Sequence, residues 1–322
     1  MSTRKKVTGV FYHPLCREHG PGEGHPECPA RFDAALAGIR RAVPPQSIVR
    51  IEPASASDAH ILLCHTPEYL ASVKRDVASG FPSLETGDTD ICGRSLDAAY
   101  MAVGCVVAAV DAVVAGNVAN AFCVTRPPGH HATPSRGMGF CIFNNVAIGV
   151  RHAQRAHGVG RALVVDWDVH HGNGTQEIFS EDPSVFYFSV HQWPLYPGTG
   201  RADDIGTGAG RGFTLNCPFA SGSGRVEILG AFQDKLLPAM RKFRPEIVFV
   251  SAGFDSRVGD RLGQFTLDDG DFAEMTRIVL GIAREYGCGR VISCLEGGYS
   301  LEGLASAVGA HVRELAASAA VS

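Results

Sequence analysis

Short runs of apolar, β-rich residues alternate along this chain with longer segments in which apolar residues recur at i, i+3 and i+4. The short runs predict eight strands, at residues 7–13, 47–52, 121–125, 162–168, 185–191, 213–218, 246–252 and 290–295. The longer segments predict helices at residues 29–43, 95–115, 143–157, 225–242, 267–286 and 301–317. Strands that alternate with helices are typical of a parallel sheet covered on both faces, so the pattern predicts an α/β fold.

The predicted elements follow one another without an internal repeat, a low-complexity tract or a long linker, so we expect residues 1–322 to form a single domain. Ser95 stands at the start of the long Ala/Val-rich helix, and Gly116 and Gly158 stand just past helix ends, where such residues are common. The stretches 14–29 and 81–94 are predicted to be long surface loops, and loops of that length are often functional.

The composition, 45% apolar and 19% charged, is that of an ordinary globular protein. A net charge of −4 and a pI of about 6.3 provide no basic surface, so direct nucleic-acid binding is not expected. The basic start of the chain is followed by an apolar run that is too short for a signal peptide. No run of about 18 apolar residues suggests a membrane span.

Ten cysteines are spread along the chain without a Cys-x-x-Cys motif, and Cys105, Cys123 and Cys294 lie inside apolar elements. This pattern is typical of reduced, buried thiols, so we expect a cytoplasmic protein whose cysteines are small core residues. No cysteine shares a polar cluster with a base, as a cysteine nucleophile would require.

Four short polar clusters each follow the end of a predicted strand. They are RPPGHH at 126–131, DWDVHHGN at 166–173, SAGFD at 251–255 and EGGY at 296–299. In a parallel sheet, ligands collect beyond the carboxyl ends of the strands, where several loops converge. We therefore expect the four clusters to meet in one pocket.

The second and third clusters contain candidate metal ligands. Alternate side chains of a strand point to the same side, so Asp166, Asp168 and His170 are expected to point together, and two of the three can share a metal ion. Asp255 arrives from another strand end as a further ligand. Zinc accepts imidazole and carboxylate ligands, and a catalytic zinc has three protein ligands and one open position. A hydrogen-bonded loop without metal is the alternative for the second cluster taken alone.

The first and fourth clusters contain candidate proton-transfer groups. The prolines and glycine before His130 and His131 fix a sharp turn that presents both imidazoles to a pocket. With Asp166 and Asn173 as partners, the two histidines are expected to act as general base and general acid. Tyr299 follows two glycines, which permit close approach of the backbone to a ligand, and its phenol can polarise a carbonyl.

Together these motifs resemble those of the histone deacetylase superfamily, and HHGNG at 170–174, GFD at 253–255 and EGGY resemble its class II and bacterial class II-like branch. HPECPAR at 25–31 is similar to a further family motif, and the resemblance covers nearly the whole chain. It implies an arginase-like three-layer α/β/α sandwich with an eight-stranded, mainly parallel sheet. It also implies one zinc-dependent catalytic domain that hydrolyses the amide of an acylated amine.

The resemblance also implies roles for individual residues. The implied zinc ligands are Asp168, His170 and Asp255. The implied catalytic groups are His130 with Asp166, His131 with Asn173, and Tyr299. The Gly139 carbonyl is implied to hold the substrate amide, Phe140 and Tyr196 to wall the channel, and Arg31 to line an internal channel for acetate release. Relatives usually carry phenylalanine where this chain has Tyr196.

A monovalent cation, usually potassium, is implied by the same resemblance. Its ligands would come from Asp166, Asp168, His170, Ser189 and Val190. A second potassium site is implied near Phe179, Val185 and Phe213. Iron(II) or cobalt(II) in place of zinc stays open.

The superfamily that this chain resembles contains lysine deacetylases, acetylpolyamine amidohydrolases and acetoin-utilisation proteins. Polyamine-selective members carry an acidic gatekeeper that attracts a distant ammonium, and Leu262 stands at that position here. This favours acetyl-lysine, in a peptide or protein, over an acetylpolyamine or another small acylated amine. Asp88 and Asp90 lie in the loop where the family binds substrate backbone, and Arg261 replaces a common proline.

Two other classes of protein remain as alternatives. An arginase-like binuclear manganese enzyme would require additional carboxylates, and the GFD motif supplies only Asp255. A catalytically silent acyl-lysine binding protein on the same fold is disfavoured because Tyr299 and both histidines are present. The acyl chain length and the oligomeric state are left open by the sequence.

Overall fold

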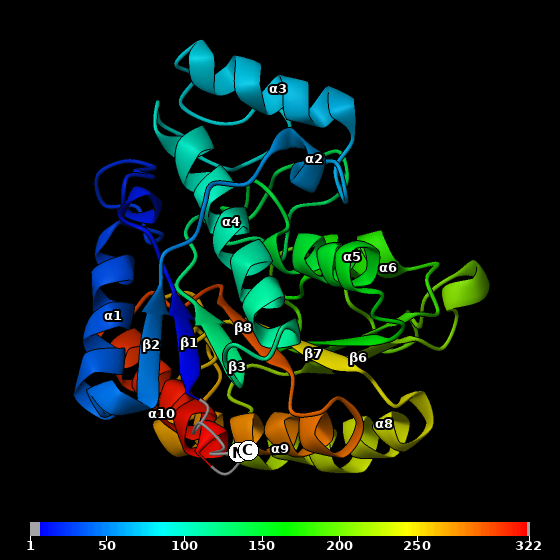
Figure 1. The fold of residues 1–322 in the computed structure, drawn as a ribbon. Coiled ribbons are helices and arrows are strands. Elements are labelled where there is room, and N and C mark those ends of the chain that lie inside the picture. Colours follow the sequence, from blue (N-terminus) through cyan, green and yellow to red (C-terminus); the bar gives the residue numbers. More distant parts are fainter. Residues whose placement is uncertain (1–6, 321–322) are drawn as a thin grey trace.

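An eight-stranded, all-parallel sheet forms the centre of the protein (Figure 1). The computed structural model describes residues 7–320. The strand order is β2-β1-β3-β8-β7-β4-β5-β6. The strand bounds are β1 Thr8–Phe11, β2 Ile48–Ile51, β3 Asn120–Cys123, β4 Ala162–Asp166, β5 Val185–Gln192, β6 Thr214–Phe219, β7 Ile247–Ala252 and β8 Val291–Leu295. All eight predicted strands are therefore confirmed.

Helices cover both faces of the sheet and complete the expected three-layer arrangement (Figure 1). One face carries α4 (Ser95–Val114), α5 (Asn145–His157) and α6 (Asn173–Phe179). The other carries α1 (Ala30–Ala42), α7 (Arg225–Ala231), α8 (Leu237–Phe243), α9 (Asp269–Tyr286) and α10 (Leu301–Ala319). The arginase-like α/β fold class predicted from the sequence is confirmed.

The four central strands, β3, β8, β7 and β4, are buried at every position. Because helices cover both faces, these strands are continuous apolar runs rather than alternating ones. Helix ends follow local signals as well. The Asn144 side chain accepts a hydrogen bond from Ala147 N at the start of α5, and Gly158 ends α5 in the left-handed conformation, with φ of 66°.

Several helices differ from the prediction. The short helix α2 (Asp58–Ile61) and the helix α3 (Pro67–Ala78) were not predicted, although Thr66 caps α3 and Pro67 occupies its first turn. Helix α6 begins inside the second polar cluster. The predicted helix 225–242 is interrupted by a π-helical turn at Phe232–Leu236. Ser95 is the first residue of α4, and its hydroxyl accepts a hydrogen bond from Cys92 N instead of capping the helix.

Helix α4 was not singled out as a membrane-span candidate by the sequence pattern, yet its length and composition meet the criteria for one. Of its most apolar window, 67% is buried inside this fold. It packs against α5 and the sheet, as the core helix of a globular domain does. Cys105 on this helix is buried in the core, and Cys123 and Cys294 are buried on neighbouring strands, as predicted.

Candidate active site

The four polar clusters meet at one edge of the sheet because β3, β8, β7 and β4 are neighbours in the strand order. Parallel strands present their carboxyl ends at the same edge, so the loops that follow them converge. These loops carry, in the same order, His130 with His131, Tyr299, Asp255, and Asp168 with His170. The structure brings these six side chains together; all six are buried.

Asp168, His170 and Asp255 each offer a buried donor atom, and these atoms all lie within 4.8 Å of one another. His170 Nδ1 lies 3.0 Å from Asp168 Oδ1 and 3.1 Å from Asp255 Oδ2. Backbone amides hold the other carboxylate oxygens, since Gly297 N donates to Asp168 Oδ2 and Val169 N donates to Asp255 Oδ1. Two carboxylates and one imidazole that converge in this way form a donor set that fits zinc.

His130 and His131 are both buried, and each is oriented by a different partner. His130 Nδ1 lies 3.1 Å from Asp166 Oδ2, and His131 Nδ1 lies 2.8 Å from Asn173 Oδ1. Both partner oxygens accept hydrogen bonds, so each Nδ1 carries the proton and each Nε2 is left to face the site. The predicted pairings of the two histidines are present.

The two imidazoles have pKa values shifted in opposite directions. Burial by itself lowers the pKa of His130, but the nearby carboxylates of Asp168 and Asp166 outweigh burial and raise this pKa to about 10. Burial lowers the pKa of His131 well below its ordinary value, and the positive charge on His130 and His170 lowers it further. The neighbouring rings therefore favour different protonation states.

Tyr299 is buried and places its phenol in the same pocket. The Arg31 guanidinium lies 4.9 Å from the centre of its ring. The glycines before Tyr299 are needed for close packing, because a Cβ at Gly297 would lie 2.1 Å from Asp255 Oδ2 and 2.6 Å from Asp168 Oδ2. A side chain at Gly297 would therefore displace the carboxylates.

A cavity of about 300 Å³ opens at this group. It is lined by Asp88, His131, Gly139, Phe140, His170, Leu195, Tyr196, Leu262 and Tyr299. The Tyr196 hydroxyl donates to Asp88 Oδ1 at 3.3 Å, and Gly139 N donates to the same oxygen at 2.8 Å. The hydroxyl that distinguishes Tyr196 from phenylalanine therefore contacts the acidic residue at the cavity. Asp90 does not line the cavity.

Comparison with known proteins identifies this architecture. Residues 25–315 match the histone deacetylase domain. The chain belongs to the histone deacetylase family. It is 38% identical to histone deacetylase 14, chloroplastic, of Arabidopsis thaliana over 91% of this chain and 73% of that protein. The fold matches the crystal structure of the HDA15 HD domain with a TM-score of 0.91 and 34% identity, covering 97% of this chain and 90% of that one.

Further relatives are named as deacetylases, and one name refers to polyamines. The chain is 42% identical to polyamine deacetylase HDAC10 of Homo sapiens over 90% of this chain, but it spans only 45% of that protein's length. It is 38% identical to a probable deacetylase of Archaeoglobus fulgidus over 92% of this chain and 82% of that protein. These relationships support a hydrolytic deacetylase activity.

The family resemblance implied that Arg31 lines an internal channel for acetate release. In the structure, Arg31 lies in a fully buried ion-pair cluster. Its guanidinium donates to Glu27 Oε1 at 2.9 Å, to the Gly298 carbonyl at 2.6 Å and to the Glu296 carbonyl at 2.5 Å. Glu27 also accepts from Arg126. Arg31 thus ties the HPECPAR segment to the EGGY loop that carries Tyr299.

The residues expected at the two potassium sites lie on β4 and β5, at the end of α6, in the loop after β4 and just before β6. Asp166 and Ser189 are partners in the β4–β5 register, and the Ser189 hydroxyl lies 2.8 Å from His191 Nδ1. For the second site, the Phe179 carbonyl accepts from Asp182 N and the Phe213 carbonyl accepts from Tyr187 N. The remaining members of the two sets, His170, Asp168, Val190 and Val185, are buried in this same region.

Two acids that support the site were not predicted, one buried (Glu296) and one partly exposed (Asp260). Glu296 Oε2 accepts hydrogen bonds from Gly129 N at 2.6 Å and His130 N at 3.2 Å, so it fixes the turn of the histidine pair. Burial raises the pKa of Glu296 to about 7. Asp260 accepts from the backbone amides of Leu262 and Tyr299, which joins the two loops that carry these residues. The sequence offered only the acidic character of each position as a signal.

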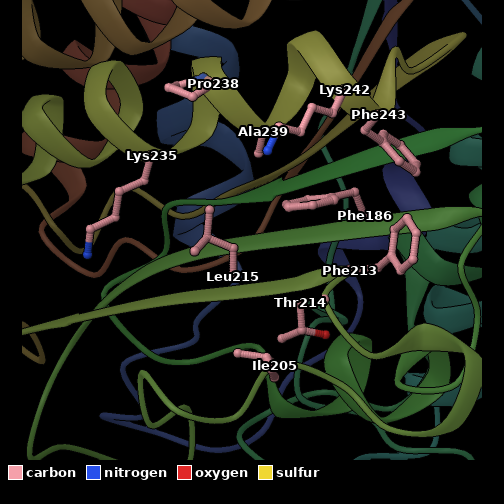
Figure 2. Close-up of a pocket in the computed structure, with 11 residues that line it drawn as sticks. Phe186, Ile205, Phe213, Thr214, Leu215, Lys235, Pro238, Ala239, Lys242 and Phe243 are labelled. Atoms are coloured by element: carbon pink, nitrogen blue, oxygen red, sulfur yellow. The ribbon is translucent and has the colours of Figure 1, made fainter.

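A larger cavity, of about 600 Å³, lies away from this site between β5, β6 and α8 (Figure 2). Its lining is dominated by aromatic and aliphatic groups, including Phe186, Phe213 and Phe243. The polar side chains are Thr214, Lys235 and Lys242, and no histidine, carboxylate or thiol lines it. The smaller cavity is therefore the candidate active site, because of the two it is the one lined by histidines, a carboxylate and the Tyr299 phenol.

Proposed function

We propose that this protein is a zinc-dependent amidohydrolase that removes an acetyl or another acyl group from the side chain of acylated lysine in a peptide or protein. The observation that carries the proposal is the converging donor set of Asp168, His170 and Asp255 at a cavity also lined by His131 and Tyr299. Metal ligands, a proton acceptor and a phenol in one pocket are the components of metal-assisted amide hydrolysis.

Zinc would be held by Asp168, His170 and Asp255, and iron(II) or cobalt(II) could use the same ligands. When bound, the ion would polarise the substrate carbonyl and activate a water molecule near neutral pH. The charge of the buried carboxylates supports a divalent cation at this position, because two carboxylates this close repel each other in a buried setting.

His131 is assigned the proton transfer. Its Nδ1–H is committed to Asn173, so Nε2 is free to take a proton from the attacking water and to pass it to the leaving amine. His130 stays hydrogen-bonded to Asp166 and contributes positive charge beside His131. The Tyr299 phenol, which lines the same cavity, donates a hydrogen bond to the oxyanion that develops on the substrate carbonyl.

The walls of the cavity suit a methylene chain that ends in an amide. Phe140, Tyr196 and Leu262 supply apolar contact. The Gly139 carbonyl accepts from the Cys141 thiol at 3.3 Å and has a second lone pair with which to accept the substrate N–H. Asp88 lies at the same cavity, where it can accept hydrogen bonds from the backbone of a bound peptide in addition to its contacts with Gly139 and Tyr196.

Acetylpolyamine hydrolysis is the second candidate function. Relatives named polyamine deacetylase favour it, and so does the carboxylate of Asp88 at the cavity, which could attract a distant ammonium group. Leu262 favours lysine, because the residue at this position of the cavity carries no charge.

We also propose that the chain binds potassium at the two sites described above and that it forms a single catalytic domain. Because its cysteines are free thiols, we propose a cytoplasmic location.

Acetate release by the zinc-loaded protein tests the function, with an acetyl-lysine peptide and an acetylpolyamine as parallel substrates. The Tyr299→Phe variant should keep its zinc but lose roughly 10²–10³-fold in turnover, because it lacks the oxyanion donor. A near-normal rate in this variant would remove Tyr299 from the mechanism. No release from either substrate by the wild-type protein would favour an acyl-lysine binding protein.

Substitution at Leu262 tests substrate selectivity. Leu262→Glu should shift the ratio of kcat/KM toward the polyamine by about 10-fold, which corresponds to ~1.4 kcal/mol of added attraction. Leu262→Gln has nearly the same size without the charge and should leave the ratio near its wild-type value. Equal shifts in both variants would show that side-chain shape, rather than charge, sets selectivity at this position.

A further inference from the structure

A second group of potential metal ligands lies on the helical face formed by α4 and α5, which pack side by side (Figure 1). Asp111 belongs to the last turn of α4, while His152 and His157 belong to α5. His152 Nε2 and His157 Nε2 each lie 2.7 Å from the same oxygen, Asp111 Oδ1. None of the three residues lines the candidate active site.

The chemistry of this group matches that of a transition-metal site. Two imidazole nitrogens and a carboxylate oxygen, all within 4.8 Å of one another, are ligands that zinc accepts. The side chains are 13%, 24% and 53% exposed for His152, His157 and Asp111, so solvent can reach a fourth ligand position. Their partial exposure also allows the small movement that a metal needs.

The size of that movement is modest. Ligand atoms around a tetrahedral zinc with bonds of about 2.1 Å lie roughly 3.4 Å apart, whereas the nitrogens now lie at hydrogen-bond distance from the carboxylate. Each contact therefore has to open by less than about 1 Å. Neither Nδ1 atom of His152 or His157 has a hydrogen-bond partner among the described residues. The other contacts of the two rings are edge-to-face ring contacts, which permit a small movement more readily than a second hydrogen bond would.

We propose that Asp111, His152 and His157 form a second metal site, which binds a divalent ion of the zinc class and joins α4 to α5. His60 lies next to this site, with its ring 5.6 Å from that of His152. Its Nδ1 accepts from Ser57 N at 3.1 Å at the start of α2, and His60 does not belong to the group whose donor atoms lie within 4.8 Å of one another, so it is not assigned as a ligand. The site is independent of the proposed amidohydrolase activity.

Binding at this site would couple to the packing of α5. Helix α5 follows directly on the loop that carries the two active-site histidines, and its cap residue Asn144 also donates to the Ala132 carbonyl of that loop. An ion that binds only the folded arrangement of α4 and α5 raises the melting temperature as its free concentration rises.

Zinc binding to the full chain, by equilibrium dialysis with elemental analysis and by calorimetry, tests the proposal. In an Asp255→Asn background, which weakens the active-site donor set, the cluster should still bind one zinc ion per chain. Adding His157→Gln or Asp111→Asn should weaken that binding by at least about 10-fold, since even indirect supports of a metal contribute that much. Circular dichroism establishes that each variant is folded.

Asp97→Asn is the matched control, because Asp97 is another half-exposed carboxylate of α4 whose ion-pair partner among residues 7–320 is Arg94 alone. It should leave zinc binding unchanged. The proposal is overturned if the Asp255→Asn protein binds no zinc, or if folded His157→Gln and Asp111→Asn proteins both bind as well as their parent. If the wild-type protein binds zinc at the cluster alone, the cluster stands and the proposed zinc-dependent function fails.

Discussion

Two buried clusters of charged side chains in this protein differ in how their charges are balanced. In the first, the ion-pair cluster of Glu27, Arg31 and Arg126, one carboxylate accepts hydrogen bonds from two guanidinium groups, at 2.9 Å from Arg31 and at 2.5 Å from Arg126. The pKa of Glu27 is about 2, because attraction to Arg126 outweighs the effect of burial. Both guanidinium groups in this cluster therefore share one opposite charge within the protein.

The second cluster, at the candidate active site, lacks this internal balance. Its buried carboxylates belong to Asp166, Asp168, Asp255 and Glu296. Burial raises the pKa of Asp255 to about 7, and repulsion by the neighbouring Asp168 carboxylate contributes to this rise. Removal of a charge from the ion-pair cluster would leave a buried charge unpaired, whereas the excess negative charge of the active site suits a bound divalent cation.

Removal of one active-site carboxylate should cause the largest loss of activity, and it should increase the stability of the metal-free protein. We expect Asp255→Asn to lose zinc at the active site and at least about 10²-fold in acetate release. In the presence of a chelator, the same variant should melt at a higher temperature than the wild-type protein, because repulsion between buried carboxylates is relieved. An acetate-release assay measures the activity, and calorimetry with and without EDTA measures the melting temperatures. A melting temperature below that of the wild-type protein in EDTA would show that the charge of Asp255 is already balanced by other groups of the protein.

The ion-pair cluster should respond to the equivalent change with a loss of stability. Glu27→Gln leaves two buried guanidinium groups without a counter-charge, so the free energy of unfolding should fall by about 3–5 kcal/mol. Urea denaturation measures this loss. The exposed pair of Arg94 and Asp97 is the control, and Asp97→Asn should cause little change. A similarly small effect of Glu27→Gln would contradict the role given to this cluster.

A smaller effect is expected from the buried histidines outside both clusters. Burial lowers the pKa of His65 to about 4 and that of His311 to about 3, from the ordinary value of 6.5. Both therefore stay neutral in the folded protein while the unfolded chain takes up protons below about pH 6.5. Stability should fall as the pH falls from 7 to 5, by about 2 kcal/mol for each histidine.

Urea denaturation at pH 7 and pH 5 measures that difference, above the range in which most carboxylates titrate. In His311→Gln the difference between the two pH values should shrink by about 2 kcal/mol, because one buried imidazole is removed. An unchanged difference would show that His311 is protonated to the same extent in both states. The test therefore concerns titratable groups that are buried without charge, in contrast to the ion-paired groups and the repelling carboxylates of the two clusters.

Local sequence signals predicted much of the fold because each strand and most helices carry their own pattern of apolar positions. All eight strands were found, and Gly158 ends α5 as expected. The helices α2 and α3 were missed. Helix α2 is a single turn, whereas the buried residues Tyr69, Leu70, Val73 and Val77 of α3 do recur at helical spacing, so that signal was present in the sequence. The π-helical turn at Phe232–Leu236 has no simple periodic signal. The Asp88 contact of Tyr196 joins residues more than 100 positions apart, so no local pattern contains it.

The sequence by itself determined which chemical groups this protein possesses. The donor residues and the likeness to the family are contained in five motifs, HPECPAR, RPPGHH, DWDVHHGN, GFD and EGGY. The tertiary structure decided which of those groups meet. The adjacency of β3, β8, β7 and β4 joins the active-site loops, and the packing of α4 on α5 brings Asp111 to His152 and His157. Strand order and helix packing depend on contacts distant in sequence, so local periodicity cannot specify them.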